Sequence, residues 1–413
     1  GDIHAITSAN NLLSAMLDNH LFRGNSLGIS KVSWKRCMDM NDRALRKIKV
    51  SVGSPSERED SFDISTASEM MAIFCLSSSL PDLQNRISRI IVGMKEDGAP
   101  VCAKDLKAEG AMALLLKDAF NPNLVQTTEG VPALVHGGPF ANIAHGTNSI
   151  ISTRMALKLA DYVVTEAGFG SDLGAEKYFD IVSRIGGFSP DAVVLVATVR
   201  AIKLQGGADA KNLESEDTHS IEAGFANVLR HAENMRKFGA DPVIAINRFP
   251  ADTEKELAMV ESLCAKNKLQ FALSEIFGKG GNGGIALAEK VLFSLESGAK
   301  CKPIYNLEML LEKKIEAIAR EIYRAKAVSF SPEAKTALNR AESIGFGNLP
   351  VCIAKTQYSF SDDPSLLNAP EGFTLNVREA RISAGAGFIV AIAGEIMTMP
   401  GLPKNPAAEK MGI

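Results

Sequence analysis

Short apolar runs alternate with long amphipathic stretches along most of this 413-residue chain. The runs rich in β-branched residues lie within residues 160–170, 190–200, 241–250 and 270–284. Short apolar runs bounded by Gly, Pro and Asp are typical of strands that are buried on both faces of a sheet. Because such strands alternate with helices, the sequence predicts βαβ units and parallel sheets, and therefore an α/β fold.

The composition limits the class of protein. Apolar residues make up 46% of the chain, charged residues make up 23%, and the formal net charge is −3. These values are typical of a globular protein and give no electrostatic footprint for nucleic acid. No apolar run reaches the roughly 18 residues that a membrane helix needs. The best candidate, residues 384–397, is interrupted by Glu395 and is expected to be a buried strand. We therefore expect neither a nucleic-acid partner nor a membrane partner.

The cysteine and histidine spacings predict neither disulfides nor a metal site. Six cysteines are scattered along the chain and never occur as CxxC, which argues against a disulfide framework and points to the cytoplasm. His136 and His145 flank a glycine-rich loop, but their spacing is not that of a zinc site. We therefore expect no metal held by protein ligands alone.

Two breaks divide the chain. A long helix-like segment over residues 219–237 ends at Gly239, and a second break lies at Gly385. Thr253 and Glu256 have the spacing of a capping box, which marks a helix start between the breaks. We therefore expect three parts, which span residues 1–238, 239–385 and 386–413.

The loops that follow the expected strands are the natural ligand sites, because open parallel sheets bind ligands at the carboxyl ends of their strands. Four such loops stand out, at residues 135–146, 165–174, 247–253 and 274–284. Three of them carry a phenylalanine beside glycine or proline, namely Phe169, Phe249 and Phe277.

These three rings have two interpretations. Glycine lets the backbone approach a ligand closely, so the rings can sandwich a planar heterocycle. Alternatively, each ring packs against the carboxyl end of its own sheet, which is the more common role of a single phenylalanine. The sequence leaves both interpretations open.

Residues 278–284, GKGGNGG, are rich in glycine but do not form a Walker A loop. That loop has the pattern GxxxxGK followed by Ser or Thr, because its amides wrap phosphates and its hydroxyl binds Mg²⁺. Lys279 is followed by Gly280, and residues 1–413 contain no Walker A pattern. We expect a flexible turn at which Lys279 can still meet an anion.

Several long blocks of the sequence resemble the formate–tetrahydrofolate ligases, also called 10-formyltetrahydrofolate synthetases. They read GDIHAITSANNLLSAMLDNH, WKRCMDMNDRALR, GGPFANIAHGTNS, LADYVVTEAGFGSDLGAEKYFDI, LPVCIAKTQYSFSDDP and GAGFIVAIAGEIMTMPGLPKNPAA. The resemblance extends over residues 1–413 and is greater to the single-function bacterial type than to the ligase part of eukaryotic trifunctional proteins.

The resemblance implies a reaction in two steps. ATP phosphorylates formate to formyl phosphate, and N10 of tetrahydrofolate then attacks the formyl carbon and expels phosphate. The resemblance also implies Mg²⁺ bound with ATP, stimulation by a monovalent cation such as K⁺ or NH₄⁺, and a homo-oligomer, usually a tetramer. For the fold it implies an incomplete P-loop-NTPase-like parallel-sheet domain over residues 1–238. A second α/β domain at residues 239–385 is expected to contribute to a folate or adenine pocket, and residues 386–413 form a small C-terminal portion.

Carried over residue by residue, the resemblance implies a pocket for the pterin or adenine ring. Its substrate-binding residues are Phe169 with its neighbours Gly168 and Gly170, then Phe249, Pro250, Leu273 and Phe277. The family commonly has tryptophan at the position of Phe277, and phenylalanine keeps a ring there but offers less stacking area.

Two polar residues match positions near the phosphoryl-transfer centre of the family. Asp2 and His136 are these catalytic candidates. Residues 355–359, together with Asp362 and Asp363, are characteristic of the family, but the resemblance implies no chemical role for them.

The family's Walker A loop, and the arginine that grips formyl phosphate, precede the GDIHAI block with which this sequence begins. We therefore expect that residues 1–413 belong to a longer protein and that activity belongs to that intact protein. Two alternatives remain. One is a split ligase in which another polypeptide supplies the P-loop, and the other is a non-catalytic folate- or nucleotide-binding protein.

Overall fold

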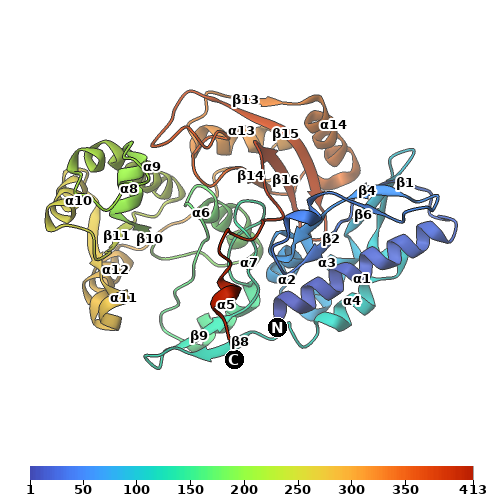
Figure 1. Cartoon of the computed structure of the whole chain (residues 1–413), viewed down its shortest axis with the longest axis horizontal. Coiled ribbons are helices and arrows are strands. Elements are labelled where there is room, and N and C mark those ends of the chain that lie inside the picture. The colour runs from blue at the N-terminus through green and yellow to red at the C-terminus, as the bar shows by residue number, and fades with distance from the viewer. Residues whose placement is uncertain (413) are drawn as a thin grey trace.

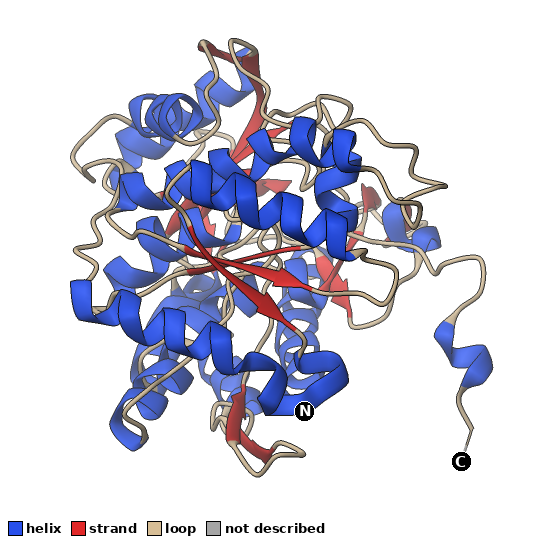
Figure 2. Cartoon of the chain, turned by 90° about the vertical axis from the view of Figure 1, so that its left-hand side faces the viewer, coloured by secondary structure: helices blue, strands red, loops and turns tan. Residues whose placement is uncertain are grey.

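The computed structural model describes residues 1–412, with the side chain of Ser297 excepted. The fold is a mixed α/β architecture in which helices surround several sheets (Figure 1, Figure 2). The two sheets that carry β10–β16 contain parallel strand pairs, as the alternating pattern predicts. Within the described range, no helix is both long enough and apolar enough to cross a lipid bilayer.

The first region is built around the long helix α1. Its helices are α1 (Asp2–Phe22), α2 (Glu69–Leu76), α3 (Leu80–Ser88), α4 (Glu109–Leu116), α5 (Ile150–Leu159), α6 (Gly174–Lys177) and α7 (Ser183–Gly186). Its strands are β1 (Ile29–Val32), β2 (Arg36–Met38), β3 (Ile48–Val50), β4 (Arg58–Asp60), β5 (Phe62–Ile64), β6 (Ile91–Lys95), β7 (Pro100–Cys102), β8 (Asn123–Gln126) and β9 (Pro132–Val135). The apolar helix α2 is buried along its whole length and packs with α1, so it forms the centre of the largest core.

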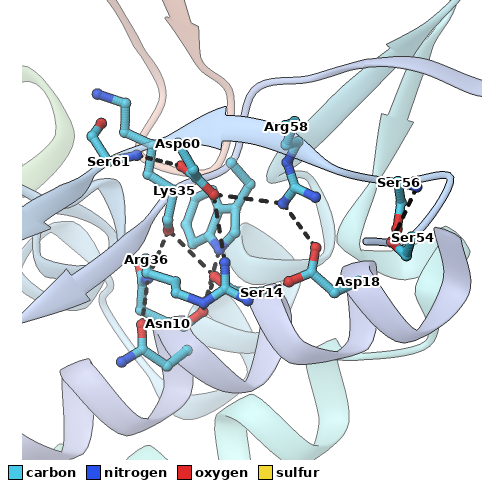
Figure 3. Close-up of polar contacts among 12 residues, drawn as sticks. Asn10, Ser14, Asp18, Lys35, Arg36, Ser54, Ser56, Arg58, Asp60 and Ser61 are labelled. Atoms are coloured by element: carbon cyan, nitrogen blue, oxygen red, sulfur yellow. Dashed lines mark hydrogen bonds and ion pairs between the residues drawn. The ribbon is translucent and has the colours of Figure 1, made fainter. Parts of the chain in front are cut away.

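Alternating charges hold α1 against the strands β2 and β4. Figure 3 shows Asp18 of α1 facing Arg58, and the Arg58 Nη2 atom donates to Asp18 Oδ1 at 2.7 Å. Arg36 of β2 also donates to Asp18, and its Nη1 atom lies 3.5 Å from Asp60 Oδ2. Because each carboxylate meets two guanidinium groups, the cluster is close to neutral and fixes the direction of α1.

The second region is a three-stranded parallel sheet in the order β10–β11–β12, at the left of Figure 1. Its strands are β10 (Val194–Ala197), β11 (Val243–Asn247) and β12 (Gln270–Ser274). Its helices are α8 (Val199–Gln205), α9 (Thr218–Phe238), α10 (Glu254–Lys266), α11 (Ile276–Lys279) and α12 (Ile285–Ser297). Ile244 and Ile246 of β11 pack with α8, α9 and α10 in one apolar cluster. The expected capping box of Thr253 and Glu256 is confirmed at the start of α10.

The third region is a four-stranded mixed sheet in the order β13–β15–β16–β14. Its elements are α13 (Leu311–Glu321), β13 (Ala327–Phe330), α14 (Pro332–Ala341), β14 (Val351–Ala354), β15 (Thr374–Ser383) and β16 (Phe388–Ala393). Strand β16 is buried at all its positions, so the buried strand expected within residues 384–397 is confirmed. Short 3₁₀ or π turns complete the fold, at Arg43–Arg46, Ser65–Ala67, Ala103–Leu106, Tyr178–Val182, Gly280–Gly284, Glu342–Phe346 and Ala407–Lys410.

The strand expected within residues 160–170 does not form. This segment makes a single bridge, between Thr147 and Ala167. Tyr162 is 67% exposed and Val164 is 97% exposed. A β-branched run forms a strand only where a neighbouring strand satisfies its backbone, and residues 1–412 offer this segment no such neighbour beyond the bridge.

Strand pairing crosses both of the boundaries expected from the sequence. The boundary at residues 238 and 239 lies between β10 and β11, which pair in parallel from Val194↔Val243 to Ala197↔Ile246. The boundary at residues 385 and 386 lies between β15 and β16, which pair as an antiparallel hairpin. A helix end and a pair of glycines therefore mark local breaks in the chain, but the sheets continue across them.

Candidate active site

Asp2 lies in the first turn of α1, where the helix dipole favours a carboxylate. Its side chain accepts hydrogen bonds from Asn123 Nδ2, at 3.0 Å to Oδ1 and 3.2 Å to Oδ2. The backbone N–H of Gly137 donates to Oδ2 at 3.1 Å. Because an ionised carboxylate offers about four acceptor positions, these three contacts leave the oxygen Oδ1 able to bind a further partner.

His136 is next to Gly137, but its imidazole faces the protein interior. Its exposed fraction is only 1%. Its Nδ1 lies 2.6 Å from Ser149 Oγ, and its Nε2 lies 2.9 Å from the carbonyl oxygen of Ala119. Burial lowers the pKa of His136, against the smaller opposing effect of the Ala119 carbonyl. Both ring nitrogens are therefore engaged, and the group that this stretch presents to Asp2 is the Gly137 N–H.

The loop of residues 136–146 packs directly against the loop of residues 167–174. Gly168 N–H donates to the carbonyl oxygen of Gly146 at 2.9 Å. A Cβ atom on Gly174 would lie 2.1 Å from the carbonyl oxygen of Gly168, so this close approach requires glycine. His145, in the first of these loops, is fully buried, and burial lowers its pKa to about 3, so it is uncharged. The two loops therefore form one packed unit.

Phe169 is held in an uncommon backbone conformation on this unit. Its φ is +60°, in the left-handed region that costs a non-glycine residue about 1 kcal/mol or more. Its ring is 50% exposed and contacts the ring of Phe140 edge-to-face, with a centroid distance of 6.2 Å. A Cβ atom on Gly170 would lie 2.4 Å from Asp172 Oδ1, which explains the glycine after Phe169. The loop thus leaves Phe169 half-exposed.

A second group of candidate residues lies at the carboxyl edge of the β10–β12 sheet. Phe249 and Pro250 follow β11, Leu273 is in β12, and Phe277 is in α11. Phe249 is 37% exposed and Phe277 is 98% exposed, whereas Leu273 packs against the apolar cluster of this sheet.

Backbone and side-chain contacts join the loops of this second group. Arg248 N–H donates to the carbonyl oxygen of Ser274 at 3.0 Å. The Arg248 guanidinium lies 3.5 Å from Glu275 Oε1, and Lys279 Nζ lies 2.6 Å from Glu275 Oε2. The loops after β11 and β12 therefore keep a defined spacing, as their parallel register requires.

The hairpin β8–β9 connects the Asp2 group with the glycine-rich loop after β12. Asn123, at its base, contacts Asp2. Glu129, at its tip, accepts a hydrogen bond from Gly281 N–H at 2.6 Å. The anion that Lys279 meets in this structure is the carboxylate of Glu275, whereas the carboxylate of Glu129 binds at the adjacent glycines.

The sequence-based candidates thus fall into two groups. His136 and Phe169 belong to the packed loops 136–146 and 167–174, which Asp2 of α1 contacts through Gly137. Phe249, Pro250, Leu273 and Phe277 share the edge of the β10–β12 sheet. Sequence analysis missed Asn123, and it did not choose Phe140 as a site residue although Phe140 lies in the first candidate loop. Phe140 carries the same signal as the other rings, since it follows a glycine pair and a proline, whereas Asn123 has no distinctive sequence context.

No cluster of three or more His, Cys, Asp or Glu side chains capable of holding a metal ion occurs in the part of the chain that the structure describes. Asp2 offers carboxylate oxygens with spare capacity beside the loop junction, and Mg²⁺ and K⁺ prefer such hard oxygen ligands.

Comparisons with known proteins show the family to which the chain belongs. The sequence profile of the family described as formate–tetrahydrofolate ligase matches residues 1–413. A protein of Staphylococcus aureus strain NCTC 8325 / PS 47, named formate–tetrahydrofolate ligase, is 55% identical over 418 residues, which cover 100% of this chain and 75% of the relative. The proteins of the same name from strains Newman and USA300 are also 55% identical with the same coverage. The chain therefore belongs to the formate–tetrahydrofolate ligase family.

Proposed function

We propose that the candidate residues serve an ATP-dependent ligation of formate to tetrahydrofolate, with the phenylalanine rings at the substrate heterocycle and Asp2 near the phosphoryl-transfer centre. The products are 10-formyltetrahydrofolate, ADP and phosphate. In the first step a formate oxygen takes the γ-phosphoryl group of ATP and releases ADP. In the second step N10 forms a bond to the formyl carbon, loses its proton, and phosphate leaves. The protein's part is mainly to position the reactants and to stabilise charge.

The exposure of Phe277 is the single observation that carries the assignment of the ring pocket. A ring that is 98% exposed does not pack against its own sheet, so the interpretation that Phe277 only fills space there loses its support. An exposed phenylalanine beside glycines is instead free to lie against a planar heterocycle. Phe249 and Phe169, which are 37% and 50% exposed, fit the same role. We assign the pterin or adenine ring to these faces, with Gly168, Gly170, Pro250 and Leu273 shaping the pocket.

Asp2 is the proposed catalytic carboxylate near the phosphoryl-transfer centre. Its two oxygens are oriented by Asn123 and Gly137, and Oδ1 retains capacity for a cation or a substrate hydrogen. Mg²⁺ bound with ATP, and a monovalent cation such as K⁺ or NH₄⁺, supply positive charge to the phosphates when they are bound.

His136 has a positioning role in this proposal. Its two nitrogens are bonded to Ser149 and Ala119, so it holds the loop that presents Gly137 and does not transfer protons.

In this proposal the loop that binds the ATP phosphates belongs to polypeptide outside residues 1–413, because those residues contain no Walker A pattern. The chain covers 75% of the length of its relatives. The β-branched segment around Val164, which is 97% exposed, supports a P-loop-NTPase-like sheet in which further strands cover this segment. Residues 194–297, which carry the β10–β12 sheet, form the unit that contributes Phe249 and Phe277. The family resemblance also supports a cytoplasmic homo-oligomer, usually a tetramer.

Two measurements test this function. Isothermal titration calorimetry of the 413-residue chain with tetrahydrofolate is expected to show saturable binding. The complete ligase, with its phosphate-binding segment, is expected to form 10-formyltetrahydrofolate only when formate, ATP and tetrahydrofolate are all present. Binding without synthesis by the complete ligase, with K⁺ and saturating substrates, would favour the alternative of a non-catalytic binding protein. Synthesis that requires a separately encoded chain would favour a split ligase.

A further inference from the structure

The stretch that follows β14, residues 355–363, has no role in the account above, yet it contains a fully buried lysine. Lys355 is 0% exposed. Its Nζ atom donates to Asp172 Oδ2 at 2.6 Å, to the carbonyl oxygen of Thr356 at 3.1 Å, and to the carbonyl oxygen of Ser359. An ammonium group has three N–H donors, so all of them are satisfied.

The partner of Lys355 belongs to the loop that carries Phe169. Asp172 follows Phe169 by three residues, and its side chain is 7% exposed. On the other side of Phe169, Gly168 N–H is bonded to Gly146. The left-handed residue is therefore fixed from both ends, by a backbone hydrogen bond before it and by a buried ion pair after it.

A second contact from the same stretch reaches this loop through α9. Phe360 packs against the His231 ring with a centroid distance of 4.6 Å. His231 Nδ1 lies 2.6 Å from Ser171 Oγ, so Ser171 and Asp172 are both held from residues 355–360.

The stretch itself is rigid enough to act as an anchor. Ser359 Oγ donates to the carbonyl oxygen of Leu366, and Ser361 Oγ donates to that of Asp363 at 3.0 Å. Asp362 Oδ2 accepts from Asn376 Nδ2 of β15 at 3.0 Å. The turn that supplies two carbonyl ligands to Lys355 is therefore tied to the four-stranded sheet.

A buried ion pair is a poor way to gain stability, because desolvation of both charges offsets their attraction. The ion pair instead restricts geometry. Removal of either partner leaves a buried charge without its counterion, and only one arrangement of the two side chains lets each charge meet the other. We propose that Lys355 is a positioning residue for tetrahydrofolate binding, which acts through Asp172 to hold Phe169 with its ring face presented to the ligand. This inference rests on the proposed function of Phe169.

The first test measures the loop without any ligand. Hydrogen–deuterium exchange of the amides of residues 168–174 is compared in the unmodified chain and in Lys355→Met. We expect exchange of these amides to rise at least about tenfold in Lys355→Met. The control Lys314→Met removes another fully buried lysine, which binds the carbonyl oxygens of Gly347 and Leu349, and is expected to leave residues 168–174 unchanged. Unchanged exchange in a folded Lys355→Met protein would overturn the proposal.

The second test is a double-mutant cycle on the Kd of tetrahydrofolate. Phe169→Ala and Lys355→Met are each expected to raise the Kd by about tenfold, and the double variant is expected to be no weaker than Phe169→Ala alone. Independent, multiplying effects would contradict a role through Phe169. If Phe169→Ala alone leaves the Kd unchanged, the proposed function of Phe169 fails, whatever the exchange measurement shows.

A milder variant covers the case in which Lys355→Met does not fold. Ser171→Ala removes only the hydroxyl that contacts His231. We expect this variant to raise the amide exchange of residues 168–174, and the Kd of tetrahydrofolate, each by about threefold. If neither quantity changes, the proposed role of residues 355–360 in holding this loop is contradicted.

Discussion

The carboxylate of Asp2, in the first turn of α1, accepts a hydrogen bond from the backbone N–H of Gly137 at 3.1 Å, across a separation of 135 residues. This contact joins the start of the long helix to the loop that carries His136 and Phe140. It places the proposed catalytic carboxylate beside the packed loops that carry Phe169. The proposed phosphoryl-transfer and ring-binding residues are therefore held by one set of contacts.

The orientation of Asp2 depends on Asn123, which contacts both carboxylate oxygens. Asn123→Ala leaves the carboxylate with the Gly137 contact alone, so we expect kcat of the complete ligase to fall by about tenfold, since a loss of 1.4 kcal/mol in positioning corresponds to that factor. Steady-state kinetics checks this. The nearby Asn121→Ala is the control, because Asn121 contacts only the Asp118 carbonyl and is expected to keep full activity. Equal kinetics for the two variants would contradict the role of Asn123.

His136 is expected to matter for stability and not for proton transfer. His136→Ala leaves the buried groups of Ser149 and Ala119 without their partner, at a cost of about 2–3 kcal/mol in the free energy of unfolding. Urea denaturation measures this change, with His219→Ala on α9 as the control. A folded His136→Ala protein with undiminished stability and a large loss of kcat would instead indicate acid–base catalysis.

Phe277 is expected to contribute to ligand binding and not to folding. Because its ring is 98% exposed, Phe277→Ala should change the free energy of unfolding by less than about 0.5 kcal/mol. Loss of a stacking ring should weaken ligand binding by about 1 kcal/mol, and Phe277→Trp should strengthen it because indole offers more area. Calorimetry with tetrahydrofolate and with ATP tells which heterocycle lies there. Phe22→Ala, another exposed ring, is the control. Unchanged affinity for both ligands would remove Phe277 from the pocket.

Glu176 is expected to make stability depend on pH. It is fully buried, and its carboxyl group lies beside that of Asp180. Burial, and then the nearby Asp180 carboxylate, raise the pKa of Glu176 well above its ordinary value, whereas Lys177 lowers it and Asp172 raises it further. Burial likewise raises the pKa of Asp180 to about 6. The pair therefore retains a proton that the unfolded chain releases at lower pH.

The sign follows from the raised pKa values. The folded state binds more protons than the unfolded state between the ordinary carboxyl pKa and the raised one, so stability falls as the pH rises through this window. Between pH 5 and pH 8, the wild-type chain should therefore lose stability relative to Glu176→Gln, because the proton that Glu176 retains in the folded state is absent from the variant. Urea denaturation at both pH values measures the difference, with the exposed Glu222→Gln as the control. A constant difference between wild type and Glu176→Gln would contradict the shared proton.

Local patterns predicted the local elements. The runs at residues 190–200, 241–250 and 270–284 form β10, β11 and β12, because the hydrophobic pattern of a buried strand is a property of the strand itself. The run around Val164 has the same pattern but lacks neighbouring strands, so pattern alone predicted a strand that the described chain does not form. Whether a segment pairs depends on its neighbours in space, which the pattern does not contain.

Long-range contacts could not be predicted from the sequence patterns either, because they also depend on which segments become neighbours in space. Lys355 and Asp172 are 183 residues apart, and nothing in either local context indicates that they pair. His136 was chosen because it borders a glycine-rich loop, yet its bonds to Ser149 and Ala119 depend on how that loop folds back. The resemblance pointed to these loops, but only the packing distinguishes a side chain that is exposed on them from one that faces the core.

The central claim is that exposed rings at glycine- and proline-flanked loops bind the heterocycle of tetrahydrofolate. The most direct measurement is calorimetric titration of tetrahydrofolate into the 413-residue chain and into its Phe169→Ala/Phe249→Ala/Phe277→Ala variant. Each lost stacking contact is worth roughly 0.5–1.5 kcal/mol, so the account predicts a Kd for the triple variant at least about tenfold higher, with the thermal unfolding transition retained. An unchanged Kd in the folded triple variant would contradict it.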